Sequence, residues 1–229
     1  MKIIKAFSVK SLVLILIITI VFCLIGGFLA INTFSSSRKF TVVIDAGHGG
    51  IDGGASGIVT GVRESDINLL IAKNLKSLFE NSGFNVVMTR DSDEGLYGTT
   101  DPGFKKRDLK KREEIINGSL ADLCVSIHLN VYSSSSRRGA QTFFNKDYPE
   151  SKKLADIIQA RINGMSMSPR LCNALSGDYY LLNTCKIPTV IVECGFLSSP
   201  DDEKLLISES YRLQISEAIF RGSIDYLSA

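Results

Sequence analysis

Two apolar runs, residues 40–45 and 123–127, limit most strongly how this chain can fold, because each leads into one of the only two histidines in the sequence. Near-continuous apolar runs of this length are typical of strands covered on both faces of a parallel sheet. The carboxyl ends of such strands meet at one edge, where open α/β sheets build their sites. We therefore expect His48 and His128 to form part of a metal site at that edge; the alternative is that each is a satisfied structural histidine.

Strand-like and helix-like patterns alternate along the rest of the chain. The expected strands are 40–45, 84–89, 123–128, 140–144, 179–182 and 188–192. The expected helices are 67–79, 105–117, 154–162, one that begins at Ser199-Pro200, and 208–226. This alternation predicts an α/β fold with a mostly parallel central sheet and helices on both faces, formed by a single domain.

The N-terminus reads as a membrane-targeting segment. Its first ten residues contain three lysines, Lys2, Lys5 and Lys10. An apolar run over residues 12–34 follows, long enough to span a bilayer rather than serve only as a signal peptide. We predict a signal anchor or, as the alternative, a cleaved signal peptide over residues 1–34, a linker over 35–39 and a catalytic domain over 40–229, outside the cytoplasmic membrane.

Charge argues against a nucleic-acid partner. Without the three N-terminal lysines, 23 basic side chains face 24 acidic ones, a net charge of −1. Nucleic-acid-binding domains are strongly basic. The one basic cluster, residues 105–112, is interpreted as a solvated helix face, although it could also help to hold an anionic polymer.

Four cysteines lie in the predicted domain: Cys124, Cys172, Cys185 and Cys194. None belongs to a CxxC pair, so a cysteine-based zinc cluster is poorly supported. We expect free, largely buried thiols. A disulfide between Cys172 and Cys185 is the alternative that an extracytoplasmic location would allow.

Two imidazoles need a third ligand, and Glu64 is the candidate. It opens the first predicted helix and shares a face with Ile67 and Ile71, which turns its carboxylate toward the sheet near the loop of His48. Two histidines, one glutamate and an open position are the composition of a catalytic zinc site. The same composition also fits the 2-His-1-carboxylate iron site of oxygenases.

A zinc hydrolase also requires a carboxylate that is not a ligand, to take a proton from the attacking water. Glu193 directly follows the apolar strand 188–192. An ionisable side chain at such a buried position is costly unless it is paired or has a function. We expect Glu193 to be this general base. The alternative is a buried carboxylate paired with an arginine such as Arg63 or Arg170.

Four segments now show a resemblance to a known family: residues 43–50, Arg63-Glu64, 126–130 and 192–198. They resemble, in order, the four motifs of the zinc-dependent N-acetylmuramoyl-L-alanine amidases. The resemblance covers about residues 41–227. It implies Zn²⁺ ligated by His48, Glu64 and His128, with Glu193 as the catalytic carboxylate. It also implies hydrolysis of the amide between N-acetylmuramic acid and L-alanine of the peptidoglycan stem peptide.

Further segments are similar to the spore-cortex branch of that family, which acts in sporulation and germination. They are residues 88–91, 108–112, 139–144 and 180–182. This similarity implies a place in the forespore envelope, a step toward muramic-δ-lactam and peptidoglycan as the partner. The absence of a separate wall-binding module from the predicted domains makes an accessory exported protein plausible. A non-catalytic wall- or partner-binding module and an iron enzyme remain the alternatives.

The N-terminal segment generates a prediction about topology. Protease added to intact protoplasts should remove the domain, because lysines before an apolar span keep the N-terminus inside. Immunoblotting with an antibody against residues 40–229 measures this. A protected domain with an accessible N-terminus would reverse the orientation, and a soluble mature chain that starts near Ile31 would mean that the segment is cleaved.

Overall fold

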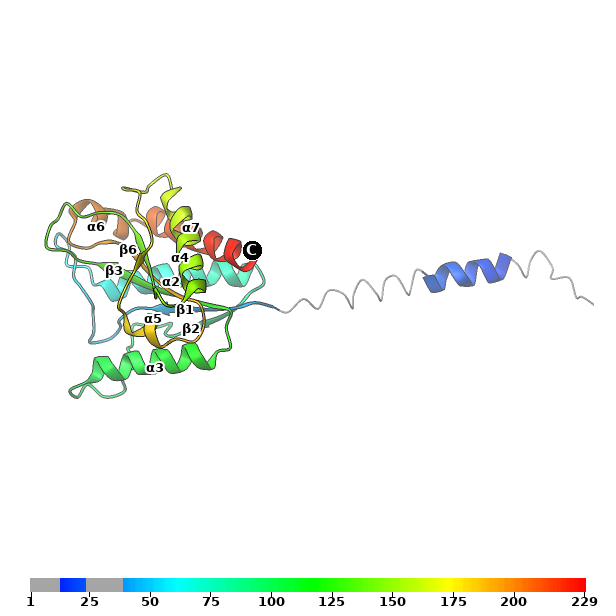
Figure 1. The fold of residues 1–229 in the computed structure, drawn as a ribbon, viewed down its shortest axis with the longest axis horizontal. Helices are drawn as coiled ribbons and strands as arrows, with labels where there is room; N and C mark the ends of the chain where they lie inside the picture. The colour runs from blue at the N-terminus through cyan, green and yellow to red at the C-terminus, as the bar shows by residue number, and fades with distance from the viewer. Residues whose placement is uncertain (1–12, 24–38) are drawn as a thin grey trace, which may run out of the picture. The chain divides into compact units, whose positions relative to one another are not determined.

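A mixed sheet runs through the middle of the domain (Figure 1). The structure is a computed structural model that describes residues 13–23 and 39–229. The strands are β1 (Thr41–Ala46), β2 (Asn85–Met88), β3 (Leu123–Asn130), β4 (Gln141–Phe144), β5 (Leu175–Ser176) and β6 (Thr189–Phe196). Their spatial order is β2-β1-β3-β6-β4-β5, and only the β4–β6 pair among them is antiparallel. The expected mostly parallel sheet is confirmed.

Helices cover both faces of the sheet, as expected (Figure 1). They are α2 (Glu64–Asn81), α3 (Phe104–Gly118), α4 (Pro149–Asn163), α5 (Tyr180–Thr184), α6 (Pro200–Ile207) and α7 (Glu209–Leu227). The larger core lies under α2, α4 and α7, and a smaller one under α3 and α5. Alternation along the strands divides the side chains between the two: Val42 and Ile44 enter the larger core and Val43 the smaller.

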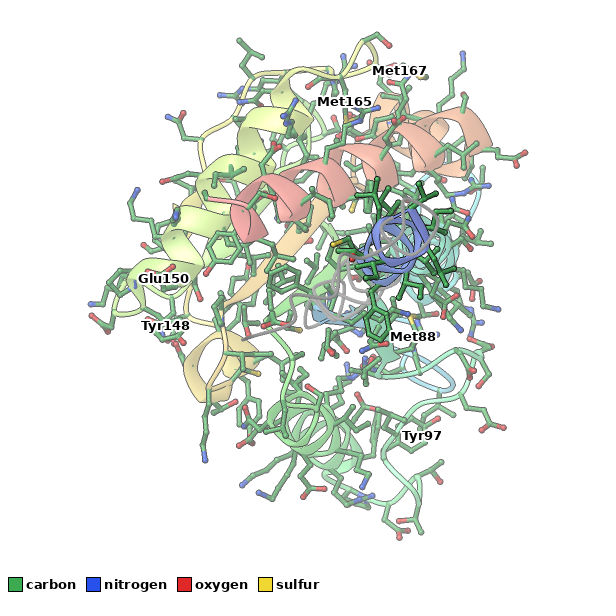
Figure 2. All side chains as sticks on the ribbon, turned by 90° about the vertical axis from the view of Figure 1, so that its right-hand side faces the viewer. Met88, Tyr97, Tyr148, Glu150, Met165 and Met167 are labelled. Atoms are coloured by element: carbon green, nitrogen blue, oxygen red, sulfur yellow. The ribbon has the colours of Figure 1, made fainter. Side chains whose placement is uncertain are left out.

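The α4–α7 pair shows how the larger layer is tied together. Tyr148 and Glu150 lie at the start of α4, and Met165 and Met167 lie beyond its far end (Figure 2). Tyr226, near the end of α7, donates a hydrogen bond to Glu150 over 3.0 Å. Both methionines pack against the larger core. At the other end of the pair, the backbone N–H of Met167 donates to Oε1 of Gln214 in α7 over 3.3 Å, so the two helices run antiparallel and are joined at both ends.

Charged side chains of α3 do not all face solvent. Arg112 is 2% exposed; its Nη1 donates to Asp45 over 2.7 Å and its Nε to Asp108 over 2.5 Å. Burial raises the pKa of Asp45, but Arg112, Ser126 and other partners outweigh it and hold that pKa at about 2. The interpretation of this cluster as a solvated face is therefore wrong for Asp108 and Arg112, which turn toward the sheet.

Two further expectations about the strands are wrong. The segment 179–182 is not a strand: Tyr180–Thr184 forms α5, because Leu181 and Leu182 bury themselves over the sheet face while Leu175–Ser176 takes the edge position. β6 also runs past Val192 to Phe196, since its fully buried end still pairs with β3.

Residues 13–23 form a helix that belongs to a separate unit of the chain, outside the domain. No helix within the described ranges is both long and apolar enough to cross a membrane. Most of the predicted N-terminal segment (1–34) and all but Lys39 of the predicted linker (35–39) lie outside the described residues. The anchor therefore stays a prediction.

Arg112 generates a prediction about stability. Its replacement by alanine should lower the free energy of unfolding by about 3–5 kcal/mol, because it leaves the carboxylates of Asp45 and Asp108 buried without a cation. Urea denaturation measures this. Lys110→Ala, which removes an exposed side chain from the same helix, is the control and should change the value by less than about 0.5 kcal/mol. Equal effects of the two substitutions would contradict the assignment.

Candidate metal centre

His48 lies in the loop that follows β1, in a backbone conformation that is rare for its type. Its φ is 61°, in the left-handed region, which costs about 1–3 kcal/mol unless the surroundings impose it. Arg112 supplies that constraint, because its Nη2 donates to the carbonyl oxygen of His48 over 2.6 Å. The strain is a sign that the position of the imidazole is fixed by the fold.

His128 lies near the end of β3, and its ring packs directly over the backbone of Gly47. A Cβ at position 47 would come within 2.3 Å of the His128 ring. Only glycine therefore allows the two strand ends to bring their histidines together. The ring centroids of His48 and His128 are 5.1 Å apart.

Glu64, the first residue of α2, lies between the two imidazoles. Its Oε1 is 3.2 Å from Nε2 of His48 and 3.1 Å from Nδ1 of His128. Backbone N–H groups hold both carboxylate oxygens: Leu129 donates to Oε1 over 3.1 Å and Ala55 to Oε2 over 2.9 Å. The carboxylate is thus oriented by the loop before α2 and the end of β3 together.

Charge reinforces this arrangement. Burial lowers the pKa of His48, but hydrogen bonds and charge from Glu64 and Asp52 outweigh it and raise that pKa to about 9. Burial raises the pKa of Glu64, yet the two histidines bring it well below its usual range. Asp52 binds Nδ1 of His48 over 2.9 Å, which leaves Nε2 turned toward Glu64.

These three residues fit a metal ion. One ligand atom from each of His48, Glu64 and His128 lies within 4.8 Å of the others. Two imidazole nitrogens and one carboxylate oxygen are the protein ligands of many catalytic zinc sites. Asp52 supplies the outer carboxylate that commonly orients a ligating histidine.

Glu193 stands beside this group without belonging to it. It opposes His128 across the β3–β6 pairing and Gln141 across the β4–β6 pairing, so the three side chains share one face of the sheet. Glu193 is 6% exposed, and no described residue hydrogen-bonds to its Oε2. Burial, the largest cause, raises its pKa to about 7, with a further increase from Glu64.

The alternative explanation of Glu193 as half of an arginine pair does not hold among the described residues. Arg63 instead binds Asp66 over 2.7 Å and Asp93 over 2.9 Å. Arg170 lines a different pocket. A buried carboxylate oxygen without a partner, next to a cluster of metal ligands, is what a general base requires.

Sequence reasoning missed the residues that hold the site from behind. Arg90 donates through Nη2 to the carbonyl oxygens of Gly47 and Ser65 and through Nε to that of Ala46. Asp52 could have been predicted from the sequence, because a carboxylate four residues after His48 can reach its ring. The sequence near Arg90 gives no comparable indication of its role.

The four cysteines of the domain are free, so the disulfide alternative is not formed. Asn130, the last residue of β3, accepts a hydrogen bond from the N–H of Val131 over 2.8 Å and so caps the end of that strand.

Comparisons with known proteins show which family this chain belongs to. A family model described as N-acetylmuramoyl-L-alanine amidase matches residues 42–225. The germination-specific N-acetylmuramoyl-L-alanine amidase of Bacillus subtilis is 35% identical over 191 residues, which cover 82% of this chain and 79% of that protein. The CwlD amidase from Clostridioides difficile, solved in complex with the GerS lipoprotein, is 41% identical with a TM-score of 0.77 over 83% of this chain and 99% of its own. An N-acetylmuramoyl-L-alanine amidase from Clostridium difficile is 32% identical, also with a TM-score of 0.77, over 84% of this chain and 99% of its own.

The cluster generates a prediction about metal content. The purified protein should hold about one divalent transition-metal ion per chain, and His48→Ala or His128→Ala should lose it, because two ligands hold such an ion far less tightly than three. Elemental analysis by mass spectrometry measures the amount and identifies the element. Glu64→Ala should weaken binding, whereas Glu80→Ala, an exposed carboxylate on the same helix, should not. An unchanged metal content in both histidine variants would contradict the assignment of these residues as ligands.

Proposed function

The chain belongs to the N-acetylmuramoyl-L-alanine amidase family, and we propose that its activity depends on zinc held by His48, Glu64 and His128. The family identifies the reaction as hydrolysis of the amide between N-acetylmuramic acid and L-alanine of the stem peptide. The single observation that carries the proposal is the convergence of these three side chains beside the buried carboxylate of Glu193, whose Oε2 has no hydrogen-bond partner among the described residues.

Zinc suits this donor set and this reaction. When bound, it would supply a Lewis acid that polarises the substrate carbonyl and makes water easier to deprotonate. An oxygenase iron would use the same ligands, but it would leave the neighbouring carboxylate of Glu193 without a task. The presence of that carboxylate favours hydrolysis.

Glu193 moves the protons in the mechanism that we propose. Its carboxylate takes a proton from the water that adds to the lactyl carbonyl carbon. The same group then returns the proton to the alanine nitrogen as the carbon–nitrogen bond breaks. Burial raises the pKa of this carboxyl group above its ordinary value, which makes it a stronger base than an exposed glutamate.

The surrounding residues keep this geometry in place. Asp52 holds His48 through Nδ1, and Arg112 fixes the carbonyl oxygen of the same residue. The N–H of Leu129 orients Glu64. None of these groups needs to touch the substrate, so their role is to position the residues that do.

We place the reaction in spore peptidoglycan. The similarity to a germination-specific amidase supports a role in the cortex, where removal of the stem peptide precedes formation of muramic-δ-lactam. The N-terminal lysines and apolar run support a position outside the cytoplasmic membrane, anchored in it or secreted, in the forespore envelope.

An accessory exported protein belongs to the same proposal. The related CwlD amidase was solved in complex with a lipoprotein, and this chain covers 99% of that amidase. A partner held at the membrane would locate the enzyme beside the cortex.

Glu193 gives the decisive test. Glu193→Gln should retain zinc and the fold while peptide release from cortex peptidoglycan falls by about 10²–10⁴-fold, because only the proton acceptor is lost. Glu64→Ala should lose activity together with the metal. Mass spectrometry of the released peptides and metal analysis of each variant are the measurements, with Glu80→Gln as the control.

Three results would count against this proposal. Release of alanine-terminated peptides by Glu193→Gln at the parental rate would exclude the proton transfer. Loss of zinc from Glu193→Gln would make Glu193 a fourth ligand. Iron in the purified protein, in place of zinc, would overturn the metal assignment.

A further inference from the structure

A pocket lies next to the candidate metal centre, and its lining includes Gln141 of β4, the residue opposite Glu193 in the sheet. Its volume is about 230 Å³. Its lining includes Arg137, Arg138, Gln141, Arg170, Asn173 and Phe196. Three arginines in so small a pocket are unusual unless their charge has a use.

One of the three arginines is already neutralised. Arg138 lies 2.9 Å from Asp201 and 3.6 Å from Asp202, both at the start of α6. The guanidinium groups of Arg137 and Arg170 have no carboxylate partner within the described ranges. Two uncompensated positive charges therefore remain in the pocket.

Arg137 is held in place without being neutralised. Its guanidinium carbon is 5.0 Å from the centroid of the Tyr132 ring and 5.8 Å from that of Phe196. Stacking of this kind restricts the side chain but leaves its N–H donors free at the edges. The group is thus ready to bind a planar anion.

Arg137 and Arg170 also act at one point. Burial raises the pKa of the Cys172 thiol, and both guanidinium groups lower it, Arg170 more than Arg137. Both arginines line the same pocket as that thiol. Two positive charges in one small pocket, without a carboxylate partner among the described residues, favour the binding of an anion there, since like charges repel.

The pocket is connected to the catalytic carboxylate by one side chain. Gln141 opposes Glu193 in the sheet, and its Nε2 donates to the carbonyl oxygen of Asn173 over 2.9 Å. Gln141 lies one strand away from Glu193, about 4.8 Å in the hydrogen-bonding direction. An extended peptide residue spans about 3.5 Å, so a side chain one or two residues beyond the scissile amide can reach the pocket that Gln141 lines.

We propose that Arg137 and Arg170 form a subsite for a carboxylate of the stem peptide. Guanidinium groups bind carboxylates through paired, charge-assisted hydrogen bonds. The occupant is the peptide and not the glycan, because the glycan's lactyl carboxyl group is tied up in the scissile amide and its sugars are neutral. A stem whose second residue is isoglutamate offers a free carboxylate at the required distance. The subsite rests on the proposed amidase function.

The test compares two soluble muramyl peptides that differ only at the second stem residue, which is isoglutamate in one and isoglutamine in the other. The full-length, zinc-loaded protein should prefer the carboxylate. Arg170→Ala and Arg137→Ala should each raise KM for the isoglutamate substrate about tenfold, with kcat and the isoglutamine substrate little changed. Arg221→Ala, an exposed arginine of α7 paired with Glu217, is the control.

Calorimetry measures the affinity of the protein for the two free peptides, and so tests the subsite independently of catalysis. The isoglutamate peptide should bind the parent about tenfold more tightly than the isoglutamine peptide, and Arg170→Ala should abolish this difference. Equal cleavage of both substrates by the parent, or equal losses on both in the variants, would overturn the subsite and leave the amidase function standing. Absence of cleavage of either substrate would count against the amidase function, and equal binding of the two peptides would then still overturn the subsite.

Discussion

Arg112 reaches from α3 under the carboxyl end of β1, where its guanidinium group binds Asp45 and the carbonyl oxygens of Ala46 and His48. The rest of the site depends on this contact. The pair is shielded from water, so its attraction is strong, and burial without a partner would be costly for either charge. The same cation that stabilises the fold therefore also holds the loop of His48 in its strained conformation.

A second arginine completes the support. Arg90 binds the carbonyl oxygens of Ala46 and Gly47, the residues just before His48. Consecutive carbonyl oxygens of one loop are thus held by buried cations, and Gly47 leaves room for the ring of His128 on the other side. The two imidazoles lie close together because hydrogen bonds fix the backbone of the loop that carries His48, and not only the side chains. Such rigidity is what a metal ligand set requires.

The sequence was sufficient for the parts of the site that topology dictates. Parallel strands end at one edge, so the histidines after two apolar runs had to meet, and Glu64 at the first turn of the following helix had to lie near them. It was insufficient where a side chain's direction depends on the whole fold. Arg112 is one basic residue among several in its helix, and only packing shows that it alone turns inward. The strand predicted over 179–182 was wrong for the same reason. Two adjacent leucines, Leu181 and Leu182, are too short a pattern to distinguish the period of a helix from that of a strand.

The layout of charge along the edge gives the substrate a direction. Acidic Glu64 and Glu193 lie with the histidines at the ends of β3 and β6. Arg137 and Arg170, which have no carboxylate partner among the described residues, line the pocket that Gln141 of β4 also lines. A stem peptide that begins at Glu193 and carries a carboxylate would run toward β4, which leaves the β1 and β2 side for the uncharged glycan. The antiparallel placement of β4 is what makes this possible: it brings the start of that strand, and the arginine segment before it, to the edge where the parallel strands end.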